Sequence, residues 1–344
     1  MKAVIFKGLR SLALEERPEP TTVQGDDVVL RVHSTGICGT DRNIYLGNFP
    51  AAPGVILGHE SVGVVEATGP DVRDLRAGDR VIVNPTLYCG TCGFCRRGAF
   101  NHCDHKVGTE VGVDRDGTMA DRAVLAERFL YKIPDSMSFD RAVFVEPLAC
   151  VLNNAHAADL RAEDDVVVLG GGPIGVIFAM LAERAALRVT LVEADPFRVD
   201  FARSRFERVV DASSEPTVEA AIAANAGRKP RVVIDTTGVL LQESIDLVSK
   251  GGTIVLMGFN AGYQPAIKPL YLVNNGISIV GAGDYNAPIF PSAIDLADAL
   301  PLDDLITHRF SLDRHDEAFG LLVADGAVDA GYGAMKILVE SSAA

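Results

Sequence analysis

Four cysteines lie close together in the chain, at a spacing that is typical of metal sites. They follow the pattern Cys-x2-Cys-x2-Cys-x7-Cys and are Cys89, Cys92, Cys95 and Cys103. Four thiolates around one ion favour a closed tetrahedral zinc site with a structural role. On these residues alone an iron–sulfur cluster is the alternative, since Cys-x2-Cys-x2-Cys also occurs in such proteins. His102 and His105 flank the last cysteine, and we expect both to face solvent.

A second set of residues combines a thiol, an imidazole and two carboxylates. Its members are Cys38, His59, Glu60 and Glu146. Taken singly they have structural explanations, because a cysteine or histidine can be a core residue and a glutamate can stand at a helix end. Together they suit a zinc ion that keeps an exchangeable position, which is the kind of site that takes part in catalysis.

A glycine-rich motif follows the apolar run Val166–Leu169 and precedes a helical pattern. The motif has the form Gly-x-Gly-x-x-Gly and comprises Gly170, Gly172, Pro173, Ile174 and Gly175. Its glycines allow a tight turn, a close approach to a pyrophosphate and close packing of helix on strand. Free N–H groups at the start of the helix attract the phosphates. A purely structural turn is the alternative, but the motif's position between strand and helix predicts a dinucleotide site.

The cofactor preference is predicted from the end of the next strand, about twenty residues further on. Glu193 stands there and can accept hydrogen bonds from both ribose hydroxyls, while its charge repels a 2′-phosphate. Arg198 has the opposite effect, because a nearby arginine tolerates that phosphate. We therefore predict NAD as the cofactor, with NADP less favoured.

These residues are carried by two kinds of sequence. Residues 1–85 contain short β-branched runs bounded by Gly, Pro or Asp, which predicts a compact, mostly β domain. From about residue 165 strands and helices alternate, with helices expected at 174–185, 196–205, 218–226 and 240–249, and six strands joined by helices predict a doubly wound parallel sheet. The segment 86–107 has almost no aliphatic side chains, so a bound ion has to hold it together.

The length of 344 residues favours two domains. The predicted division is 1–150 for the β domain with its cysteine lobe, 151–287 for the nucleotide-binding domain, and 288–344 for a return to the first domain.

Composition excludes some partners and favours one compartment. The chain has 32 Lys and Arg against 46 Asp and Glu, a formal charge of −14, which disfavours nucleic acid and membrane surfaces as partners. Apolar runs stay well short of the roughly 20 residues of a membrane span. The N-terminus is charged within ten residues and does not resemble a signal peptide. With its bunched thiols, the chain is expected to be cytoplasmic.

The motifs occur in the order seen in zinc-dependent medium-chain alcohol dehydrogenases, and the chain resembles that family over essentially its whole length. The resemblance includes Gly58-His59-Glu60, the Ala77–Val81 turn, the cysteine lobe and the glycine motif. It implies a GroES-like β domain with a Rossmann domain, and one catalytic and one structural zinc. It also decides against an iron–sulfur cluster.

The resemblance assigns roles to individual residues. Cys38 and His59 would ligate the catalytic zinc, Thr40 would begin a proton relay from the substrate, and Asp41 would orient His59 by accepting its other N–H. Glu146 stands where ethanol-oxidising members have a cysteine, which is similar to the polyol branch of sorbitol, threonine, galactitol, glucose and aminocyclitol dehydrogenases. In that branch Glu60 can ligate zinc, and the residue matching Glu146 ligates it or holds its water.

Two positions depart from the family's pattern. Asn43 replaces a histidine that often ends the proton relay, so the proton needs another route. Asn153 and Asn154 stand where polyol relatives commonly carry a histidine, and an Asn there is shared with some aminocyclitol dehydrogenases. Cys150 is expected to be a core residue near a helix start.

The predicted function is that of a zinc-dependent NAD(H) oxidoreductase. It would interconvert a secondary alcohol of a polyol, sugar or cyclitol and the ketone by hydride transfer. The alternatives are an amino-alcohol (threonine-like) dehydrogenase and an inactive nucleotide-binding relative. Tyr45, Phe49 and Arg115 are candidates to line the substrate site, with ordinary loop packing as the alternative. A homodimer or homotetramer is expected, paired through the apolar segment Ser278–Gly283.

Overall fold

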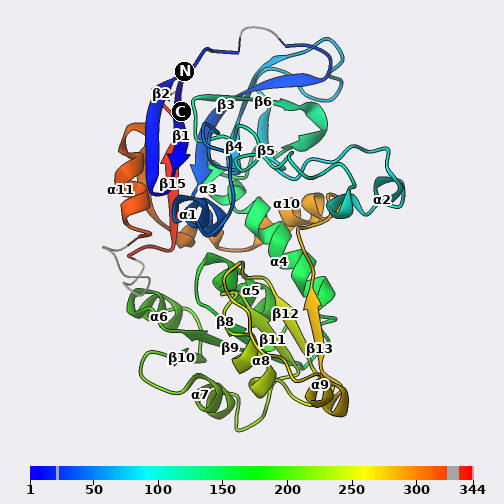
Figure 1. Cartoon of the computed structure of the whole chain (residues 1–344). Coiled ribbons are helices and arrows are strands. Elements are labelled where there is room, and N and C mark those ends of the chain that lie inside the picture. Colours follow the sequence, from blue (N-terminus) through cyan, green and yellow to red (C-terminus); the bar gives the residue numbers. More distant parts are fainter. Residues whose placement is uncertain (21–22, 324–332, 343–344) are drawn as a thin grey trace. The chain divides into compact units, whose positions relative to one another are not determined.

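The computed structural model describes residues 1–20, 23–323 and 333–342, and they form two units (Figure 1). The first unit contains 1–149, 286–323 and the chain from Lys336 onward. The second contains 150–285 and the short stretch that ends at Met335. The predicted fold class, a mostly β domain together with a Rossmann domain, is confirmed.

The first unit is built on two sheets. The smaller is an antiparallel pair, β1 (Lys2–Gly8) with β2 (Ser11–Glu16). The larger has seven strands in the order β14-β15-β3-β4-β5-β7, and β6 also pairs with β3. Its strands are β3 (Asp27–Gly36), β4 (Glu60–Thr68), β5 (Arg80–Val83), β6 (Arg122–Ala126), β7 (Leu130–Lys132), β14 (Ile306–Ser311) and β15 (Lys336–Glu340).

The pairing of β3 with β4 and β15 brings distant parts of the chain to one place. β3 runs antiparallel to both, and Gly36 at its end lies opposite Glu60 on β4 and Leu338 on β15. Inward-facing aliphatic side chains of β3, β4 and β5 form the core of this sheet, among them Val28, Val65 and Val81. The C-terminal part of the chain thus contributes a strand beside the metal-ligand candidates.

Short helices surround these sheets. They are α1 (Gly39–Tyr45), α2 (Gly93–Arg96), α3 (Phe139–Ala142), α10 (Ile289–Ala299), α11 (His315–Gly320) and the 3₁₀ turns η1 (Phe100–His102), η2 (Glu127–Phe129), η3 (Leu302–Leu305) and η4 (Leu312–Arg314). The longer helix α4 (Val145–Ala157) follows α3 and carries Glu146 in its first turn.

The second unit is a six-stranded sheet whose strands are all parallel, in the order β10-β9-β8-β11-β12-β13. The strands are β8 (Asp165–Leu169), β9 (Arg188–Glu193), β10 (Val209–Asp211), β11 (Val232–Asp235), β12 (Thr253–Leu256) and β13 (Ser278–Gly281). The helices are α5 (Pro173–Arg184), α6 (Pro196–Arg203), α7 (Thr217–Ala224), α8 (Leu241–Leu247) and α9 (Pro269–Asn275). This is the doubly wound pattern predicted from the sequence.

Helix ends differ from the predicted ones for local reasons. The helix predicted to reach residue 205 ends at Arg203, where Ser204 is the C-cap. The one predicted to reach 226 ends at Ala224, because Ala226 and Gly227 adopt positive φ. α9 has no counterpart among the predicted helices, and it buries none of its residues. Its signals are Pro269 at the start and the left-handed Gly276 at the end.

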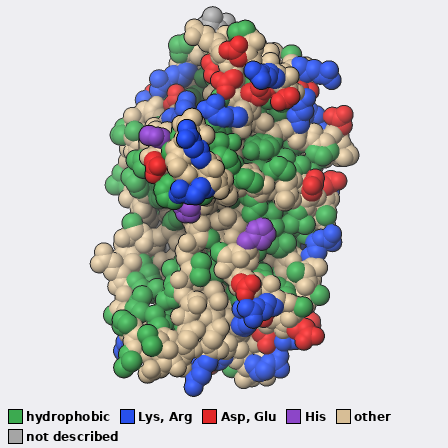
Figure 2. Space-filling model, turned by 90° about the vertical axis from the view of Figure 1, so that its right-hand side faces the viewer, with side chains coloured by type: hydrophobic (Ala, Val, Ile, Leu, Met, Phe, Trp, Pro, Cys, Tyr) green, Lys and Arg blue, Asp and Glu red, His purple; other side chains and the backbone are tan. Residues whose placement is uncertain are grey.

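Within the described residues no helix has both the length and the apolar character needed to cross a membrane. On the face seen in Figure 2, basic side chains are interspersed with acidic ones.

An ion pair at the amino ends of two neighbouring strands, β8 and β11, leads to a first prediction. Arg231 donates to Asp164 from Nε at 2.5 Å, the Arg161 N–H donates at 2.7 Å, and Asp164 is 8% exposed. Burial raises the pKa of Asp164, but these donors outweigh it and lower the pKa below its usual value. A depressed carboxylate pKa means that the stabilisation is present above the unfolded pKa and is lost as pH falls through the folded pKa.

Asp164→Asn should therefore lower the free energy of unfolding by about 1–3 kcal/mol at pH 7. The difference from the wild type should shrink below about pH 4, where the unfolded carboxyl takes up its proton. Urea unfolding at both pH values measures this. Asp159→Asn is the control, because its pair with Arg161 is exposed on both sides and contributes little. Equal losses in the two variants at pH 7 would contradict the prediction.

Candidate functional site

Three of the predicted zinc ligands come together in the first unit. The ligand atoms of Cys38, His59 and Glu60 all lie within 4.8 Å of one another. Cys38 is the N-cap of α1, and Glu60 is the first residue of β4, directly after His59. His59 and Glu60 are 7% and 2% exposed. A thiol, an imidazole and a carboxylate at this spacing fit a zinc ion.

The geometry around His59 fits a metal ligand. Its Nδ1 is buried and makes no hydrogen bond within the described residues. The same atom lies 3.9 Å from Asp41 Oδ1. At that distance the two groups interact by charge, and the hydrogen bond implied by the family resemblance stays a prediction. Burial lowers the pKa of His59, but the charges of Asp41 and Cys38 outweigh burial and raise it well above the usual value.

Asp41 is held by the backbone on either side of the site. Its Oδ2 accepts from the Cys38 N–H at 2.9 Å, and its Oδ1 accepts from the Gly58 N–H at 3.2 Å. Its side chain is fully buried, which is the main cause that raises its pKa. By accepting from Cys38 and from the residue before His59, Asp41 fixes both ligand-bearing segments. The Thr40 hydroxyl lies 3.7 Å from Cys38 Sγ.

A buried lysine pairs with Glu60, and the sequence analysis did not single it out. Lys336 Nζ forms an ion pair with Glu60 Oε2 and donates to the Ile37 carbonyl at 3.3 Å. Lys336 is 2% exposed. Gly36 makes room for the pair, because a Cβ there would lie 2.5 Å from Glu60 Oε2. A lysine inside the otherwise apolar run Ala334–Val339 was the available sequence signal.

Glu146 belongs to the same buried region. Its side chain is 7% exposed, and burial, with the charges of Glu60 and Glu110, raises its pKa to about 7 against the lowering effect of His59 and Lys336. A buried carboxylate with a raised pKa is stabilised by a nearby cation or by protonation. Cys38, His59 and Glu60 thus form a donor set that fits zinc, while Glu146 lies outside that three-residue cluster and its role as a ligand stays a prediction.

The four cysteines form a second cluster. The sulfur atoms of Cys89, Cys92, Cys95 and Cys103 lie within 4.8 Å of one another. Backbone N–H groups point at them: Cys92 Sγ accepts from Cys95 N at 3.5 Å, and Cys89 Sγ accepts from Cys92 N at 3.3 Å. Hydrogen bonds from Thr91 lower the pKa of Cys89 to about 5, whereas burial raises that of Cys95 to about 12. The set fits a closed zinc site.

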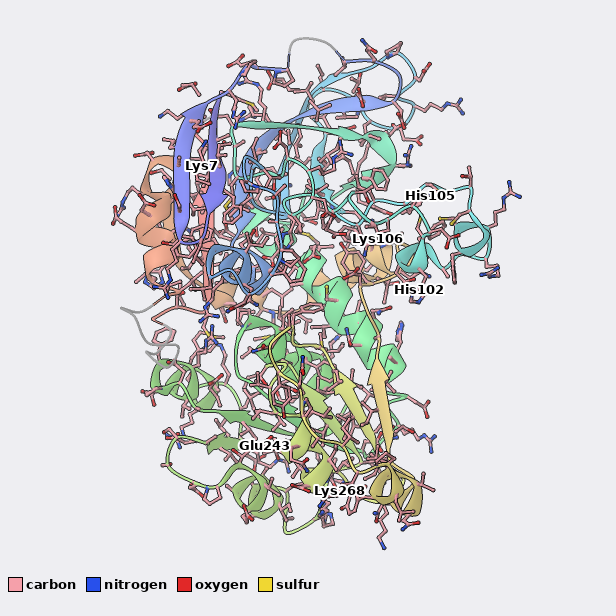
Figure 3. The ribbon with its side chains drawn as sticks, viewed as in Figure 1. Lys7, His102, His105, Lys106, Glu243 and Lys268 are labelled. Carbon is pink, nitrogen blue, oxygen red and sulfur yellow. The ribbon has the colours of Figure 1, made fainter. Side chains whose placement is uncertain are left out.

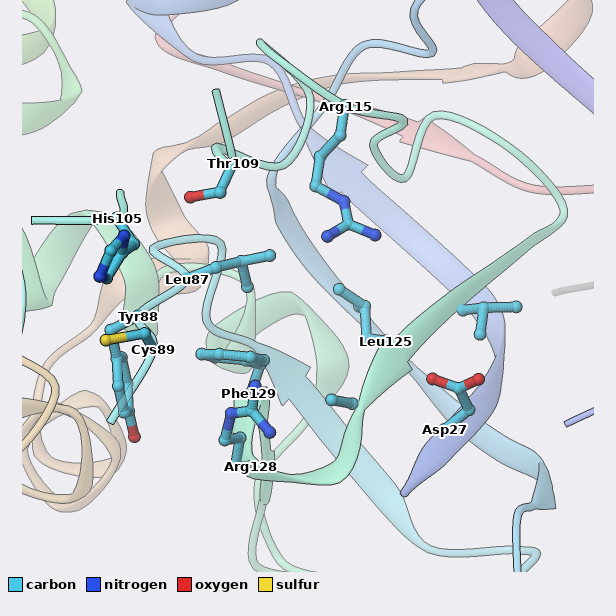
Figure 4. Close-up of a pocket in the computed structure, with 12 residues that line it drawn as sticks. Asp27, Leu87, Tyr88, Cys89, His105, Thr109, Arg115, Leu125, Arg128 and Phe129 are labelled. Atoms are coloured by element: carbon cyan, nitrogen blue, oxygen red, sulfur yellow. The ribbon is translucent and has the colours of Figure 1, made fainter. Parts of the chain in front are cut away.

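The lobe around this cluster carries His102 and His105, which Figure 3 labels and which are both exposed. Beside it lies a cavity of about 460 Å³, lined by residues that include Cys89, Thr109 and Arg115 (Figure 4). Of the side chains suggested to line a substrate site, Arg115 thus lies at this cavity, while Tyr45 packs on Phe319 with ring centroids 5.4 Å apart.

The glycine motif has the geometry expected of a nucleotide turn. Gly170 follows β8 with φ of +99°, a conformation open to glycine. Gly172 is the N-cap of α5, and Pro173 and Ile174 are its first residues. A Cβ on Gly175 would lie 1.9 Å from the Gly170 carbonyl oxygen, so the helix start lies directly on the turn.

Glu193 and Arg198 both lie against this turn. Glu193 ends β9, and its Oε2 accepts from the Gly171 N–H at 2.6 Å. Its Oε1 accepts from Ala194 N at 2.7 Å. A Cβ on Gly172 would lie 3.3 Å from an Arg198 guanidinium nitrogen. The carboxylate and the guanidinium thus lie near the same turn, and their roles toward the cofactor stay predictions.

The sequence analysis missed a further carboxylate at the carboxyl end of the parallel sheet. Asp235 ends β11, is 1% exposed and accepts from the N–H groups of Thr237, Gly238 and Leu240. It orders the turn that follows β11. The signal available in the sequence was an acidic residue at the end of an apolar strand, the same signal that identified Glu193.

The departures from the family pattern have structural consequences in α4. Asn153 donates to the carbonyls of Ala282 and Asp284 at 3.2 and 3.3 Å, and Asn154 donates to the Cys150 carbonyl at 2.8 Å. Asn153 therefore connects α4 to the segment that follows β13.

Comparisons with known proteins place the chain in one family. Residues 24–135 match the model of the alcohol dehydrogenase GroES-like domain, and 173–299 match that of zinc-binding dehydrogenases. A probable D-xylulose reductase A from Arthroderma otae is 31% identical over 92% of both chains. Among solved structures, an NADP-bound zinc-binding dehydrogenase from Sinorhizobium meliloti 1021 has a TM-score of 0.87 at 30% identity, covering 98% of each chain. An alcohol dehydrogenase from Escherichia coli CFT073 complexed with NADH has a TM-score of 0.88 at 29% identity, covering 99% of each.

The cysteine cluster leads to a second prediction. Cys95→Ser removes one of four ligands from a lobe with little hydrophobic core, so zinc content should fall by about one equivalent per chain. The melting temperature should fall by at least about 4 °C, because structural zinc contributes directly to folding. Metal analysis and thermal unfolding measure both. Cys150→Ser, which lies outside both clusters, is the control and should retain full zinc. Unchanged metal content in Cys95→Ser would contradict the assignment.

Proposed function

Because the chain belongs to the zinc-containing medium-chain alcohol dehydrogenase family, we propose that it is an NAD(H)-dependent polyol dehydrogenase. It interconverts a secondary alcohol of a polyol, sugar or cyclitol and the corresponding ketone. The observation that carries this is the buried cluster of Cys38, His59 and Glu60, with ligand atoms within 4.8 Å of one another. A carboxylate in place of a second thiol favours a polar substrate, and a D-xylulose reductase is among the relatives.

In this proposal each residue near the metal site has a separate role. When bound, zinc lowers the pKa of an alcohol and NAD accepts a hydride. Cys38 and His59 bind the metal together with Glu60 or Glu146, and Asp41 holds their backbone segments in place. Thr40 is the hydroxyl placed beside Cys38 to take up the substrate's proton.

Glu193 supports NAD as the preferred cofactor. Its carboxylate lies against the glycine turn, where it would accept from the ribose hydroxyls and repel a 2′-phosphate. Arg198 of α6, whose guanidinium lies against the same turn, explains tolerance of NADP at lower affinity. The phosphates would lie at the start of α5, over Gly172, Pro173 and Ile174.

The assembly and location belong to the same proposal. β13 is an edge strand, and next to it α9 exposes Leu270 and Val273 by 70% and 76%. Apolar side chains beside an open strand edge favour pairing with a second copy of the chain, as a homodimer or homotetramer. Cysteines that ligate zinc have to stay reduced, and this supports the cytoplasm as the compartment.

The direct test is NADH formation by zinc-loaded protein with polyols, sugars, cyclitols, amino alcohols and simple alcohols. Turnover should concentrate on one polyhydroxy class. Cys38→Ser should lower kcat/KM by at least about 100-fold through loss of a metal ligand. Its affinity for NADH, measured by fluorescence, should stay that of the wild type. Activity retained in Cys38→Ser would overturn the assignment, and turnover confined to amino alcohols would favour the threonine-like alternative.

A separate prediction concerns the cofactor. Glu193→Ala should raise KM for NAD and reduce the preference for NAD over NADP by about 10-fold, since about 1.4 kcal/mol of charge repulsion and hydrogen bonding is lost. The ratio of kcat/KM values for the two cofactors measures it. Asp200→Ala removes an exposed carboxylate from α6 and should leave the ratio unchanged. If both variants behave alike, Glu193 does not read the ribose.

A further inference from the structure

Three buried hydroxyl groups lie against the backbone that leads into His59, and the proposed mechanism leaves them unused. They belong to Thr35 on β3, Ser61 on β4 and Thr118, and each residue is 0% exposed. Thr35 and Ser61 are opposite one another in the antiparallel pair of β3 and β4, with Thr35 Oγ1 2.9 Å from Ser61 Oγ. Ser61 Oγ is also hydrogen-bonded to Thr118 Oγ1. We call these three residues the hydroxyl triad.

The hydroxyl triad ends on the backbone carbonyl of Gly58. Thr118 donates to this carbonyl from Oγ1 and from its backbone N–H, both at 3.0 Å. A hydroxyl has a single hydrogen, so Ser61 has to be the donor toward Thr118. Thr35 donates to Ser61 or to the Thr118 carbonyl oxygen, which lies 2.9 Å from its Oγ1. The bonds from Ser61 through Thr118 therefore run toward Gly58, and successive bonds in one direction strengthen each other.

Both polar groups of the Gly58 backbone are held in place. Its N–H donates to Asp41 Oδ1 at 3.2 Å, and Asp41 Oδ2 accepts from the Cys38 N–H at 2.9 Å. Gly58 has a φ of +91°, and a Cβ there would lie 2.7 Å from Thr35 Cγ2. Because a peptide group is planar, fixing the Gly58 carbonyl also fixes the direction in which the backbone enters His59.

The hydroxyl triad also joins the two segments that carry the clustered ligands. Thr35 precedes Cys38 on the segment that leaves β3, and Ser61 directly follows Glu60. Successive side chains of a strand point to opposite faces, so Ser61 faces away from the Glu60 carboxylate and its ion pair with Lys336. The hydroxyls therefore do not compete for a metal ion and act only on the backbone that carries the ligands.

We propose that the hydroxyl triad consists of positioning residues for the catalytic zinc, an inference that rests on the proposed function. It fixes the Gly58 carbonyl and joins β3 to β4, and so holds His59 and Glu60 where both reach one ion. Ligands that are already ordered lose little conformational freedom when the metal binds, and the affinity for zinc is higher for that reason. Thr118 carries most of the effect, because it alone donates to Gly58.

Thr118→Val tests the proposal, because valine has the shape of threonine but no hydroxyl. In the full chain, the affinity of the catalytic site for zinc should fall by about 10-fold, measured by competition with a chromophoric chelator. The four-cysteine site is the internal reference and should retain one zinc per chain. With Co²⁺ bound at the Cys38–His59–Glu60 cluster, the visible absorption bands should shift, since they report ligand geometry. Thr118→Ser keeps the hydroxyl and should restore most of the affinity.

A purely structural role of the hydroxyl triad predicts a different result. Val28→Ala removes buried methyl groups near the start of β3, whereas Thr35 lies near its end, and it destabilises the same sheet. Melting temperatures of all variants are measured alongside. Val28→Ala should lower the melting temperature and keep the wild-type zinc affinity and Co²⁺ spectrum. If it weakens zinc binding as much as Thr118→Val at a similar loss of melting temperature, the triad acts through stability alone and the proposal is wrong.

The outcomes separate this inference from the proposed function. If the wild type binds zinc only at the four cysteines, the catalytic site fails and the role of the triad fails with it. If the wild type binds two zinc ions and Thr118→Val binds both as tightly, only the role of the triad is wrong. Should Thr118→Val fold poorly, Ser61→Ala removes the middle hydroxyl and adds no atom. Weaker binding at the catalytic site alone then supports the proposal, and wild-type affinity overturns it.

Discussion

The burial of several charges in one place is the constraint on which the rest of the first unit depends. The residues concerned are Asp41, His59, Glu60, Glu146 and Lys336. Each would be costly to bury alone, since an isolated charge in a protein interior loses its hydration. The fold answers with opposite charges and backbone donors: Lys336 for Glu60, and the N–H groups of Cys38 and Gly58 for Asp41. The sheet order β15-β3-β4 makes the first of these pairs possible, because it brings Lys336 on β15 to Glu60, the first residue of β4.

Much of the fold and of the site could be predicted from the sequence, because the relevant signals are local. The four cysteines of the lobe lie within fifteen residues, and the glycine motif lies between one strand and one helix. Alternation of strands and helices likewise predicted the parallel sheet. Cys38 and His59 could be paired only through the family resemblance, and the structure then brought their ligand atoms within 4.8 Å of each other.

What escaped prediction depends on register between distant segments. Glu60 and Lys336 are 276 residues apart, and their pairing follows from how β15 lies in the sheet. Residues 110–117 lie against the backbone of Gly58 because Gly112 and Gly117 carry no side chain. Neither alternation of apolar residues nor motif spacing contains that information. The helix ends at Arg203 and Ala224 were misplaced for a smaller reason, since capping and positive φ are decided residue by residue.

The carboxylates around the site have different partners, and this difference suggests a division of labour. Glu60 has a buried ammonium group beside it, so its charge is balanced before any metal binds. Burial, with the charges of Glu60 and Glu110, raises the pKa of Glu146 to about 7, although His59 and Lys336 act in the opposite direction. Lys336 thus balances the charge of Glu60 by a direct ion pair, whereas at Glu146 the effect of burial prevails over that of the nearby positive charges.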